Sequence, residues 1–526
     1  MPQHTAARNG ETSPLLGAQQ QHYPESEVQK PAPPRWLWQA KNPHTVVLIL
    51  AIISFFVCSA SAMVNMALTR LIEDNLCHRF YDRNEGTSRS YLPIDEKDCK
   101  FDKLQSDLAY LLGATSTIEA IFCLVFAFPY GILADIIGRK PVFLLSVSGA
   151  AINIIFTLAV LWFRYSASYT MLGPVFSIIG GGNAVFMAVL YSMVSDVLTC
   201  HGSSAFFVLT LSALIGNSAA PAVAANLMHT FSPWVPALLA LVIVPLAIGL
   251  VVFVPETLPL AKQKQHPEIL RTHEAEDPDA DTDHHHHHSE APTHSFKSKL
   301  TQTFNHLKDF LSAISFRNPS LILVLATFLV RMPETYATGM LFVQYVSVRA
   351  GWTIAEAGYL LAVRGAINMV VLLIALPVLS KLVIFQAGSV AAKDLSLARF
   401  SAGFAVLGLL LIGAPSVGVM IVGLGLSTFA AGLAPLCRSL ASSYVAPEDT
   451  SKLYTLIGML DAGGLIYAGP SMAWLFTKGM QLKGLWMGLP YFVLAGAYVL
   501  CVVVLLLVRV PPLPIVDDDE LEEDRL

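Results

Sequence analysis

The stretch that decides the fold is "GILADIIGRKP", residues 131–141. It places two cations, an anion and two glycines between two long apolar runs, near 106–129 and 141–163. Charged residues are costly in lipid, so a short charged segment between two such runs is typical of a loop between two membrane-spanning helices. The stretch therefore predicts a chain that crosses a membrane more than once.

Composition extends this prediction to the whole chain. Hydrophobic residues make up 54% of the 526 residues and charged residues only 13%, which is typical of a polytopic membrane protein. A helix needs about 20 apolar residues to cross a bilayer, and barrel strands would alternate instead of running continuously. The ninth and tenth runs are separated only by "APS" at 414–416, so the count is eleven or twelve. The runs lie near 45–67, 106–129, 141–163, 170–194, 203–228, 233–254, 320–346, 354–380, 399–415, 417–442, 453–474 and 485–508.

Positive charges in the short loops predict which side faces the cytosol. Arg139 and Lys140 follow the second run, and Lys452 precedes the eleventh. These loops are predicted to be cytosolic, together with both termini. Residues 70–105 then lie on the noncytosolic side, although they hold seven Lys or Arg beside eight Asp or Glu.

The apolar runs and polar segments divide the chain into five parts. Residues 45–254 and 320–508 hold six runs each. We therefore expect an all-α membrane protein with twelve transmembrane helices in two six-helix bundles. Residues 1–44 predict a disordered cytosolic tail and not a signal peptide, while 255–319 and 509–526 predict an acidic cytosolic linker and an acidic tail.

The N-terminal tail contains "ETSPLL", in which Glu11 stands four residues before Leu15 and Leu16. This spacing resembles the acidic dileucine signal that sorting adaptors read on vacuolar and lysosomal membrane proteins. The same pattern also arises by chance in many tails. We predict a sorting adaptor as a partner and a vacuolar membrane as the location, with the plasma membrane as the alternative.

The linker contains two local patterns. Five consecutive histidines at 284–288 could bind zinc or sense pH, but such a run is more often a tolerated repeat, so no metal site is predicted. Residues 296–314 carry apolar residues near helical spacing with scattered lysines. They predict an amphipathic helix on the cytosolic surface.

Two of the seven cysteines differ from the others in their setting. Five lie in or beside apolar runs, where they act as small core residues. Cys77 and Cys99 lie in the noncytosolic segment, an oxidising space, where a disulfide is expected. A disulfide between these two cysteines would close the loop between them and stabilise the fold by roughly 3 kcal/mol.

The opening stretch matches the G-x-L-A-D-R-x-G-R-K pattern between spans two and three of the major facilitator superfamily, so the chain resembles that family. "VPETLP" at 254–259 closes the sixth run as in many members. The segment with Cys77 and Cys99 is similar to a fungal branch related to the proton-coupled folate transporter group. One departure is Ile136, where the family usually has a cation. The matching residues are Gly131, Leu133, Ala134, Asp135, Gly138, Arg139 and Lys140.

The resemblance implies that this motif is a conformational latch. In the family it locks the two halves together in the outward-open state, and Asp196 matches an acid that partners the motif's arginine. Gly131 is expected to let two helices approach closely, and Asp135 to meet a cation or a helix N-terminus. The apolar Ile136 predicts a weaker latch. The expected latch comprises Gly131, Asp135, Gly138, Arg139, Lys140 and Asp196.

Five charged residues fall near the middle of predicted spans: Glu119, Arg331, Glu334, Arg364 and Asp461. A charge at that depth costs a few kcal/mol and usually lines a cavity with a partner. Carriers of this architecture place substrate and coupling sites there. We expect the carboxylates to carry protons and the arginines to hold an anionic substrate or a carboxylate. The alternative is a set of buried salt bridges that only stabilise packing.

The seventh and eighth runs carry three of these charges. Arg331 and Glu334 are three residues apart, so they share a helix face and are within reach of one another. Pro333 between them would loosen the helix and free backbone groups toward a cavity. Asn368 stands one turn from Arg364 as a polar neighbour.

The stretch "GNSAAPAVAA" in the fifth run gives an indication of the direction of transport. Gly216 and Pro221 match the antiporter motif G-x-x-x-G-P-x-x-G-G, and alanines replace its other glycines. "YAGP" at 467–470 is a second small-residue and proline bend in the other half. Such residues permit close helix contact, so the match favours efflux by a small margin.

Three functions are compatible with these patterns. The first is a secondary active carrier, expected to be proton-coupled, that exports a small organic solute from the cytosol or loads it into a vacuole by alternating access. The second is a proton symporter that imports an organic anion, and the third is a receptor or scaffold on the same fold. No phosphate-binding loop or enzyme motif is present, so neither an enzyme nor an ATP-driven pump is expected. Expected partners are protons, the solute and the lipid bilayer. Cofactors and nucleic acid are not expected, and the chain is predicted to be a monomer.

Overall fold

The computed structural model describes residues 39–40, 42–85, 94–197, 202–258, 319–375, 377–378, 390–445 and 450–509. Four features predicted above lie outside these described residues. They are the sorting signal at Glu11, Leu15 and Leu16, the histidine run at 284–288, the amphipathic segment at 296–314 and the acidic C-terminal tail.

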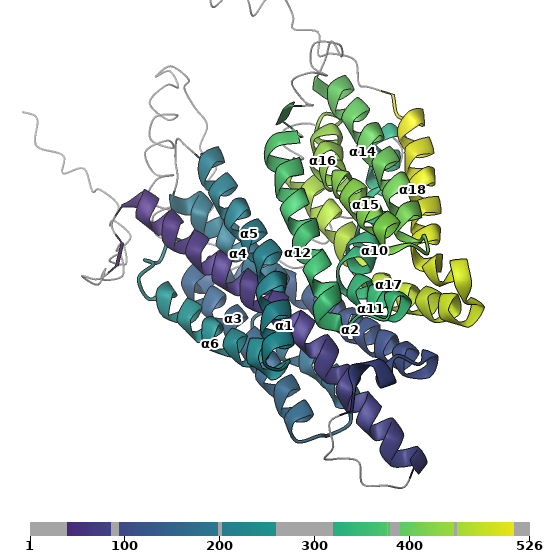
Figure 1. The fold of residues 1–526 in the computed structure, drawn as a ribbon. Coiled ribbons are helices and arrows are strands. Elements are labelled where there is room, and N and C mark those ends of the chain that lie inside the picture. The colour runs from purple at the N-terminus through teal and green to yellow at the C-terminus, as the bar shows by residue number, and fades with distance from the viewer. Residues whose placement is uncertain are drawn as a thin grey trace, which may run out of the picture. The chain divides into compact units, whose positions relative to one another are not determined.

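The first six spans are helical and pack into one bundle (Figure 1). The helix α1 packs against α5 and α6, while α3 packs against α4, α6 and the short helix η3. These elements are α1 (Pro43–Glu85), η2 (Glu96–Cys99), α2 (Asp102–Ile137), α3 (Arg139–Trp162), η3 (Ala167–Ile178), α4 (Gly182–Val197), α5 (Gly202–Thr230) and α6 (Trp234–Val251).

The second six spans form a second bundle around α14, which packs against α15, α16 and α18, while α10 packs against α17. The elements of this bundle are α9 (Pro319–Ala326), α10 (Phe328–Thr338), α11 (Met340–Ala350), α12 (Ile354–Val370), η4 (Val371–Ala375), α14 (Val390–Ile412), α15 (Val417–Ser427), η5 (Thr428–Gly432), α16 (Leu433–Ser442), α17 (Thr450–Leu482), η7 (Gly484–Gly488) and α18 (Leu489–Leu507).

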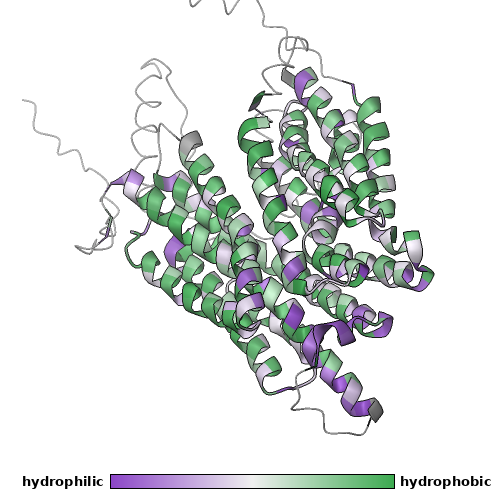
Figure 2. Ribbon diagram, viewed as in Figure 1, coloured by the Kyte–Doolittle hydropathy of each residue, from purple (hydrophilic) through white to green (hydrophobic). Residues whose placement is uncertain are grey.

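The predicted all-α membrane fold is confirmed. Within the described residues, eleven helical segments are long and apolar enough to cross a membrane, and α17, with 33 residues, is a further long helix. No strand occurs among the residues that the structure describes. Large apolar side chains such as Leu48, Val242 and Leu500 are exposed on the helices, and Figure 2 shows hydrophobic residues covering both bundles. Such an apolar surface is stable only against lipid.

Two spans differ from the predicted ones. The first apolar run ends near residue 67, but α1 continues to Glu85, because charged residues end a lipid-crossing segment without ending a helix. The seventh run is broken into α9, α10 and α11, with interruptions at Thr327 and Gly339. Pro333 lies inside α10. The broken span frees backbone groups at the depth where charged residues occur.

A charge cluster joins the end of α1 to η2 at the predicted noncytosolic end. The buried Glu73 accepts hydrogen bonds from Lys100 Nζ and Gln105 Nε2, each at 2.6 Å. Arg70 contacts Glu96 through Nε at 3.0 Å. A disulfide between Cys77 and Cys99, with Cα atoms 5.6 Å apart, ties the same two segments together. We call Arg70, Glu73, Glu96 and Lys100 the noncytosolic cluster.

This cluster also reaches the second bundle. Glu96 accepts a hydrogen bond from the backbone N–H of Ile354 at 2.7 Å, at the first turn of α12. Gln344 of α11 donates to the backbone oxygen of Gln105 at 2.7 Å. A carboxylate is favourable at a helix N-terminus, where free N–H groups and the helix dipole are both positive. The noncytosolic cluster thus connects the two bundles.

Small residues form the other contacts between the bundles. The helices α2 and α17 meet at Gly113 and Gly469, where a Cβ added to Gly113 would lie 2.8 Å from the Gly469 oxygen. Thr117 donates to the Ile466 oxygen across the same crossing, at 3.0 Å. On α5 and α12, Ser218 lies directly against Gly365. Both proline-bend segments of the sequence therefore lie where the bundles touch.

We predict that Gly469→Val lowers the stability of the protein. A branched side chain at this crossing meets the Gly113 backbone, and such overpacking typically costs about 1–3 kcal/mol. The measurement is thermal unfolding of the detergent-solubilised full-length chain. Gly496→Val is the matched control, because its Cβ would meet nothing within 4 Å and it lies in α18. Equal unfolding temperatures for the two variants would contradict the close crossing of α2 and α17.

Candidate functional site

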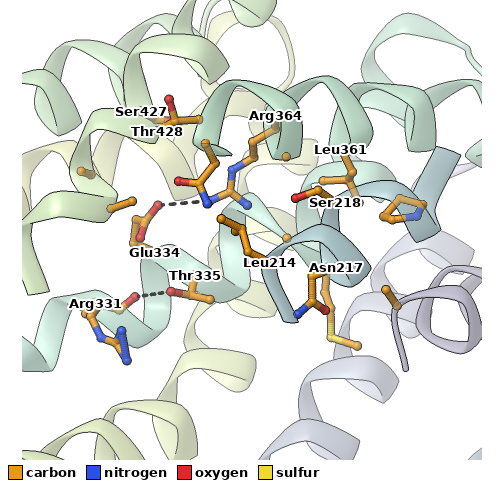
Figure 3. A pocket seen from close by; sticks show the side chains of 18 of the residues that line it. Leu214, Asn217, Ser218, Arg331, Glu334, Thr335, Leu361, Arg364, Ser427 and Thr428 are labelled. Carbon is orange, nitrogen blue, oxygen red and sulfur yellow. Dashed lines mark hydrogen bonds and ion pairs between the residues drawn. The ribbon is translucent and has the colours of Figure 1, made fainter. Parts of the chain in front are cut away.

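A pocket of about 440 Å³ lies between the two bundles. Helices α1 and α5 line it from the first bundle, and α10, α11, α12 and η5 line it from the second. Figure 3 shows Leu214, Asn217 and Ser218 of α5 on the side opposite Arg364 and Glu334. The volume of the pocket is in the range of small-molecule sites.

Asp461 of α17 is clamped by two arginines. Arg331 Nε and Nη2 lie 3.2 and 3.1 Å from its two carboxylate oxygens, and Arg438 Nη2 lies 3.1 Å from Oδ2. Arg331 lines the pocket, whereas Asp461 and Arg438 do not. The predicted pairing of Arg331 with Glu334 is therefore wrong. The guanidinium points away from Glu334 (Figure 3), because the bidentate fork fits the facing carboxylate of α17.

Glu334 is held more loosely, by Arg364 of α12. Arg364 Nη2 lies 3.7 Å from Glu334 Oε1, which is an ion pair but too long for a hydrogen bond. The same carboxylate accepts a hydrogen bond from Thr338 Oγ1 at 3.2 Å. Arg364 Nη1 donates to the Thr338 oxygen at 3.1 Å. Glu334 and Arg364 both line the pocket, so this weak pair is open to a solute.

Glu119 of α2 stands apart from these pairs. It does not line the pocket, and no hydrogen-bond or ion-pair partner for it exists among the described residues. Its neighbour is Cys123, one turn further along α2. The Cys123 sulfur in turn lies close to Gly182, at the start of α4. A half-buried carboxyl in a membrane span with no cation beside it has only a proton to neutralise it. The structure thus brings together four of the five predicted residues and separates the fifth.

The residues of the latch motif contact one another and the segment that follows α6, at one end of the first bundle. Arg139 Nη1 lies 2.7 Å from Asp135 Oδ1, and its Nε lies 3.4 Å from Asp196 Oδ2. Glu256, from "VPETLP", accepts hydrogen bonds from the backbone N–H groups of Arg139 and Lys140 at 2.9 and 3.1 Å. Each of these contacts lies within the first bundle. The bridging of the two halves by this motif stays a prediction.

Three glycines of the predicted sites have different surroundings. A Cβ at Gly131 would meet nothing within 4 Å, so its expected role in close helix contact is wrong for this structure. Gly138 has a φ of 109° and faces the Glu256 carboxylate, where a side chain would clash. Gly216 packs against the Phe55 oxygen of α1, and Pro221 lines the pocket. Ile136 is exposed.

Sequence reasoning missed several functional candidates. Arg438 lies inside the tenth apolar run, and the rule that an intramembrane charge needs a partner would have found it. Glu73 and Glu96 lie in a segment dense with charges of both signs, so nothing in the sequence distinguishes them. Gln105 and Gln344 are neutral and lie in different bundles, and only the folded structure brings them together.

A second cavity, of about 910 Å³, lies within the first bundle near the C-terminal part of α1. Its lining includes Asp74, His78, Arg79 and Arg164, and none of the predicted site residues. No group of three or more His, Cys, Asp or Glu that could hold a metal occurs in the parts of the chain that the structure describes. The pocket between the bundles is therefore the stronger candidate. Its chemistry is suited to binding an anion and a proton.

Comparison with known proteins agrees with this architecture. The family model described as Major Facilitator Superfamily matches residues 50–392. The chain is 31% identical over 481 residues to the MFS efflux pump atnC of Emericella nidulans, covering 89% of this chain and 88% of that protein. It is 22% identical over 500 residues to the efflux pump ustT of Aspergillus flavus, covering 92% of each.

Among solved structures, the inward-open xylose transporter XylE from E. coli is similar in fold. The TM-score is 0.54 at 16% sequence identity, and the match covers 91% of this chain and 99% of that one. The family and the relatives are transporters. The chain is a multi-pass membrane protein that belongs to the Major Facilitator Superfamily.

Proposed function

We propose that this protein is a proton-coupled secondary carrier that exports a small organic solute by alternating access. The observation that carries the proposal is the pocket between the bundles, which is lined from both sides and contains Arg331, Glu334 and Arg364. A solute bound there touches both bundles, so relative movement of the bundles would expose it to one side of the membrane and then to the other.

The contacts between the bundles support this mechanism. They use small residues, at Gly113 with Gly469 and at Ser218 with Gly365, together with a few polar contacts at the noncytosolic cluster. Backbone-to-backbone packing of this kind can separate without leaving large side chains unpacked. The polar contacts are at a membrane surface, where water can replace the lost hydrogen bonds. The noncytosolic side could therefore open without a large loss of stability.

Glu119 is the proposed proton carrier. Asp461 is neutralised by two guanidinium groups, and Glu334 has Arg364 beside it. Only Glu119 among the three predicted carboxylates has no cation near it in the described structure. An anion without a partner is unfavourable in a membrane span, so uptake and release of a proton at Glu119 would be coupled to its access to water. Because α2 also carries Gly113, that access would change when α2 and α17 separate.

Export is the proposed direction. Two relatives that resemble this chain over most of its length are efflux pumps, those of Emericella nidulans and Aspergillus flavus. The fifth span adds support, because Gly216 packs against α1 and Pro221 lines the pocket, at the positions where the sequence resembles an antiporter motif.

A second candidate function is a proton symporter that imports an organic anion. The observation that favours it is the loosely held Arg364, which faces the pocket and has an ion-pair distance of 3.7 Å to Glu334. Exchange of an exported anion for an entering proton moves charge across the membrane, whereas symport of a proton with a monoanion does not. The resemblance to the proton-coupled folate transporter group remains part of this second candidate.

We predict that Glu119→Gln strongly reduces solute flux driven by an imposed pH gradient, because glutamine cannot exchange a proton. The measurement is flux across proteoliposomes, screened over a metabolite panel with and without the gradient. Glu356→Gln is the matched control. Glu356 is exposed and accepts a hydrogen bond from the Thr353 N–H in the capping box of α12, a bond that glutamine can also accept. Undiminished pH-driven flux in the Glu119 variant would contradict the assignment.

We predict that removal of residues 1–20 shifts the protein from the vacuolar to the plasma membrane. The truncation deletes Glu11, Leu15 and Leu16, the proposed sorting signal. Fluorescence microscopy of the tagged full-length chain is the measurement, and a variant with both leucines replaced by alanine is the narrower test. Vacuolar fluorescence that persists in both variants would reject the signal.

A further inference from the structure

We infer that the pocket selects a solute with one negative charge, an organic monoanion with an apolar body, and that Arg364 receives the anionic group. This inference rests on the proposed function, because it names the class of solute that the carrier binds. Two observations support it. The first is the balance of charges around the pocket, and the second is the difference in the groups that Arg331, Arg364 and Arg438 contact.

The charges around the pocket do not cancel. Three guanidinium groups, of Arg331, Arg364 and Arg438, are paired with only two carboxylates, of Glu334 and Asp461. No other carboxylate pairs with these arginines in the described part of the chain. One positive charge is therefore left over, on guanidinium side chains that are 25 to 41% exposed. Such an excess of one sign of charge beside a pocket attracts an anion.

Arg364 is the arginine with free capacity. Within the described structure its one hydrogen bond is to the Thr338 oxygen, and Glu334 lies 3.7 Å from its Nη2. A guanidinium group has five N–H donors in a planar fork that fits a carboxylate. Figure 3 shows the group beside Glu334, near Ser218 and Leu361. An entering carboxylate would thus meet a cation whose donors are largely unused.

Arg331 is less available, because two of its nitrogen atoms hold Asp461 at 3.1 and 3.2 Å. Arg438, which does not line the pocket, holds the same carboxylate. Together they keep Asp461 fully paired while a solute comes and goes. Arg438 therefore acts as a positioning residue, which supplies the excess charge without lining the pocket.

The other residues that line the pocket indicate the size and polarity of the rest of the solute. Leu214, Leu361 and Met340 are apolar, and Asn217 and Thr428 add hydrogen-bonding groups. A cavity of about 440 Å³ holds a molecule the size of a small ring system. A dianion would bring more negative charge than the arginines can balance unless Glu334 took up a proton. A cation would add to the excess, and a neutral solute would leave it in place.

The experiment measures binding to the purified full-length chain in lipid nanodiscs by calorimetry at neutral pH. The probes are matched pairs of carboxylates and their primary carboxamides on several small aromatic and alicyclic scaffolds. The carboxylate of a pair is expected to bind at least about tenfold more tightly than its amide, a ratio equal to about 1.4 kcal/mol.

Variants distinguish the effect of the excess positive charge from the effect of direct contact with the solute. Arg438→Gln removes the excess charge without changing the pocket lining, and it is expected to abolish most of the preference for the carboxylate. Adding Asp461→Asn to that variant restores an excess of one positive charge, and the preference is expected to return. Lys478→Gln is the matched control, since it removes a cation from an exposed position of α17 and should change nothing.

Three binding results would overturn the inference. They are an amide that binds as tightly as its carboxylate throughout the panel, a panel in which no carboxylate binds, and an Arg438→Gln variant that keeps the full preference. Flux measurements distinguish this failure from failure of the proposed function. Proton-driven flux of a neutral or cationic solute would overturn only the inference, while absence of any flux would overturn the proposed function and leave the binding result to decide the inference.

Discussion

The bidentate pairing of Arg331 with Asp461 is the interaction on which the rest of the site depends. A guanidinium group cannot lose its charge inside a membrane, so each arginine at mid-membrane depth requires a carboxylate or an anion. Asp461 satisfies Arg331 and Arg438 at once, at distances of 3.1 to 3.2 Å. This double pairing joins α10, α16 and α17 within the second bundle. It also leaves Arg364 with only the looser Glu334.

The arrangement of helices follows from the same constraint. Charged side chains at mid-membrane must face away from lipid, so α10, α12 and α17 turn their polar faces inward and expose apolar ones. The break of the seventh span at Gly339 lies beside the pocket, where backbone groups need not face lipid. The first bundle contributes mainly neutral groups, such as Asn217 and Ser218. The second bundle thus supplies the charge, and the first bundle supplies the opposite wall.

Much of the fold could be predicted from hydropathy, because burial in lipid requires long continuous apolar runs. The charged mid-span residues were also visible, since each is an exception within such a run. Their pairing was not, because it depends on which helices face one another. Arg331 and Glu334 share a face of α10, yet each pairs with a residue on another helix, Asp461 and Arg364. The role of Gly131 was misjudged for the same reason, since a glycine shows that close contact is possible and not where a partner lies.

The noncytosolic contacts are beyond sequence prediction in another way. Glu96 meets the N-terminus of α12 across 258 residues of sequence, and Gln105 meets Gln344 across 239. Polar residues in a charged loop follow no periodic pattern, so the sequence does not distinguish those that join the two bundles from those that face water. The disulfide between Cys77 and Cys99 holds this loop against α1, so that Glu96 and Lys100 keep their positions at the boundary between the bundles.

In the proposed mechanism, the pocket between the bundles is the transport path, and it opens when these noncytosolic contacts separate. The most direct test replaces Gln105 and Gln344 with cysteine and joins them with a short, reducible thiol crosslinker in proteoliposomes. Crosslinking is predicted to stop solute flux, and reduction is predicted to restore it, while each single-cysteine variant is insensitive to the reagent. Flux that continues at the same rate in the fully crosslinked protein would contradict the account.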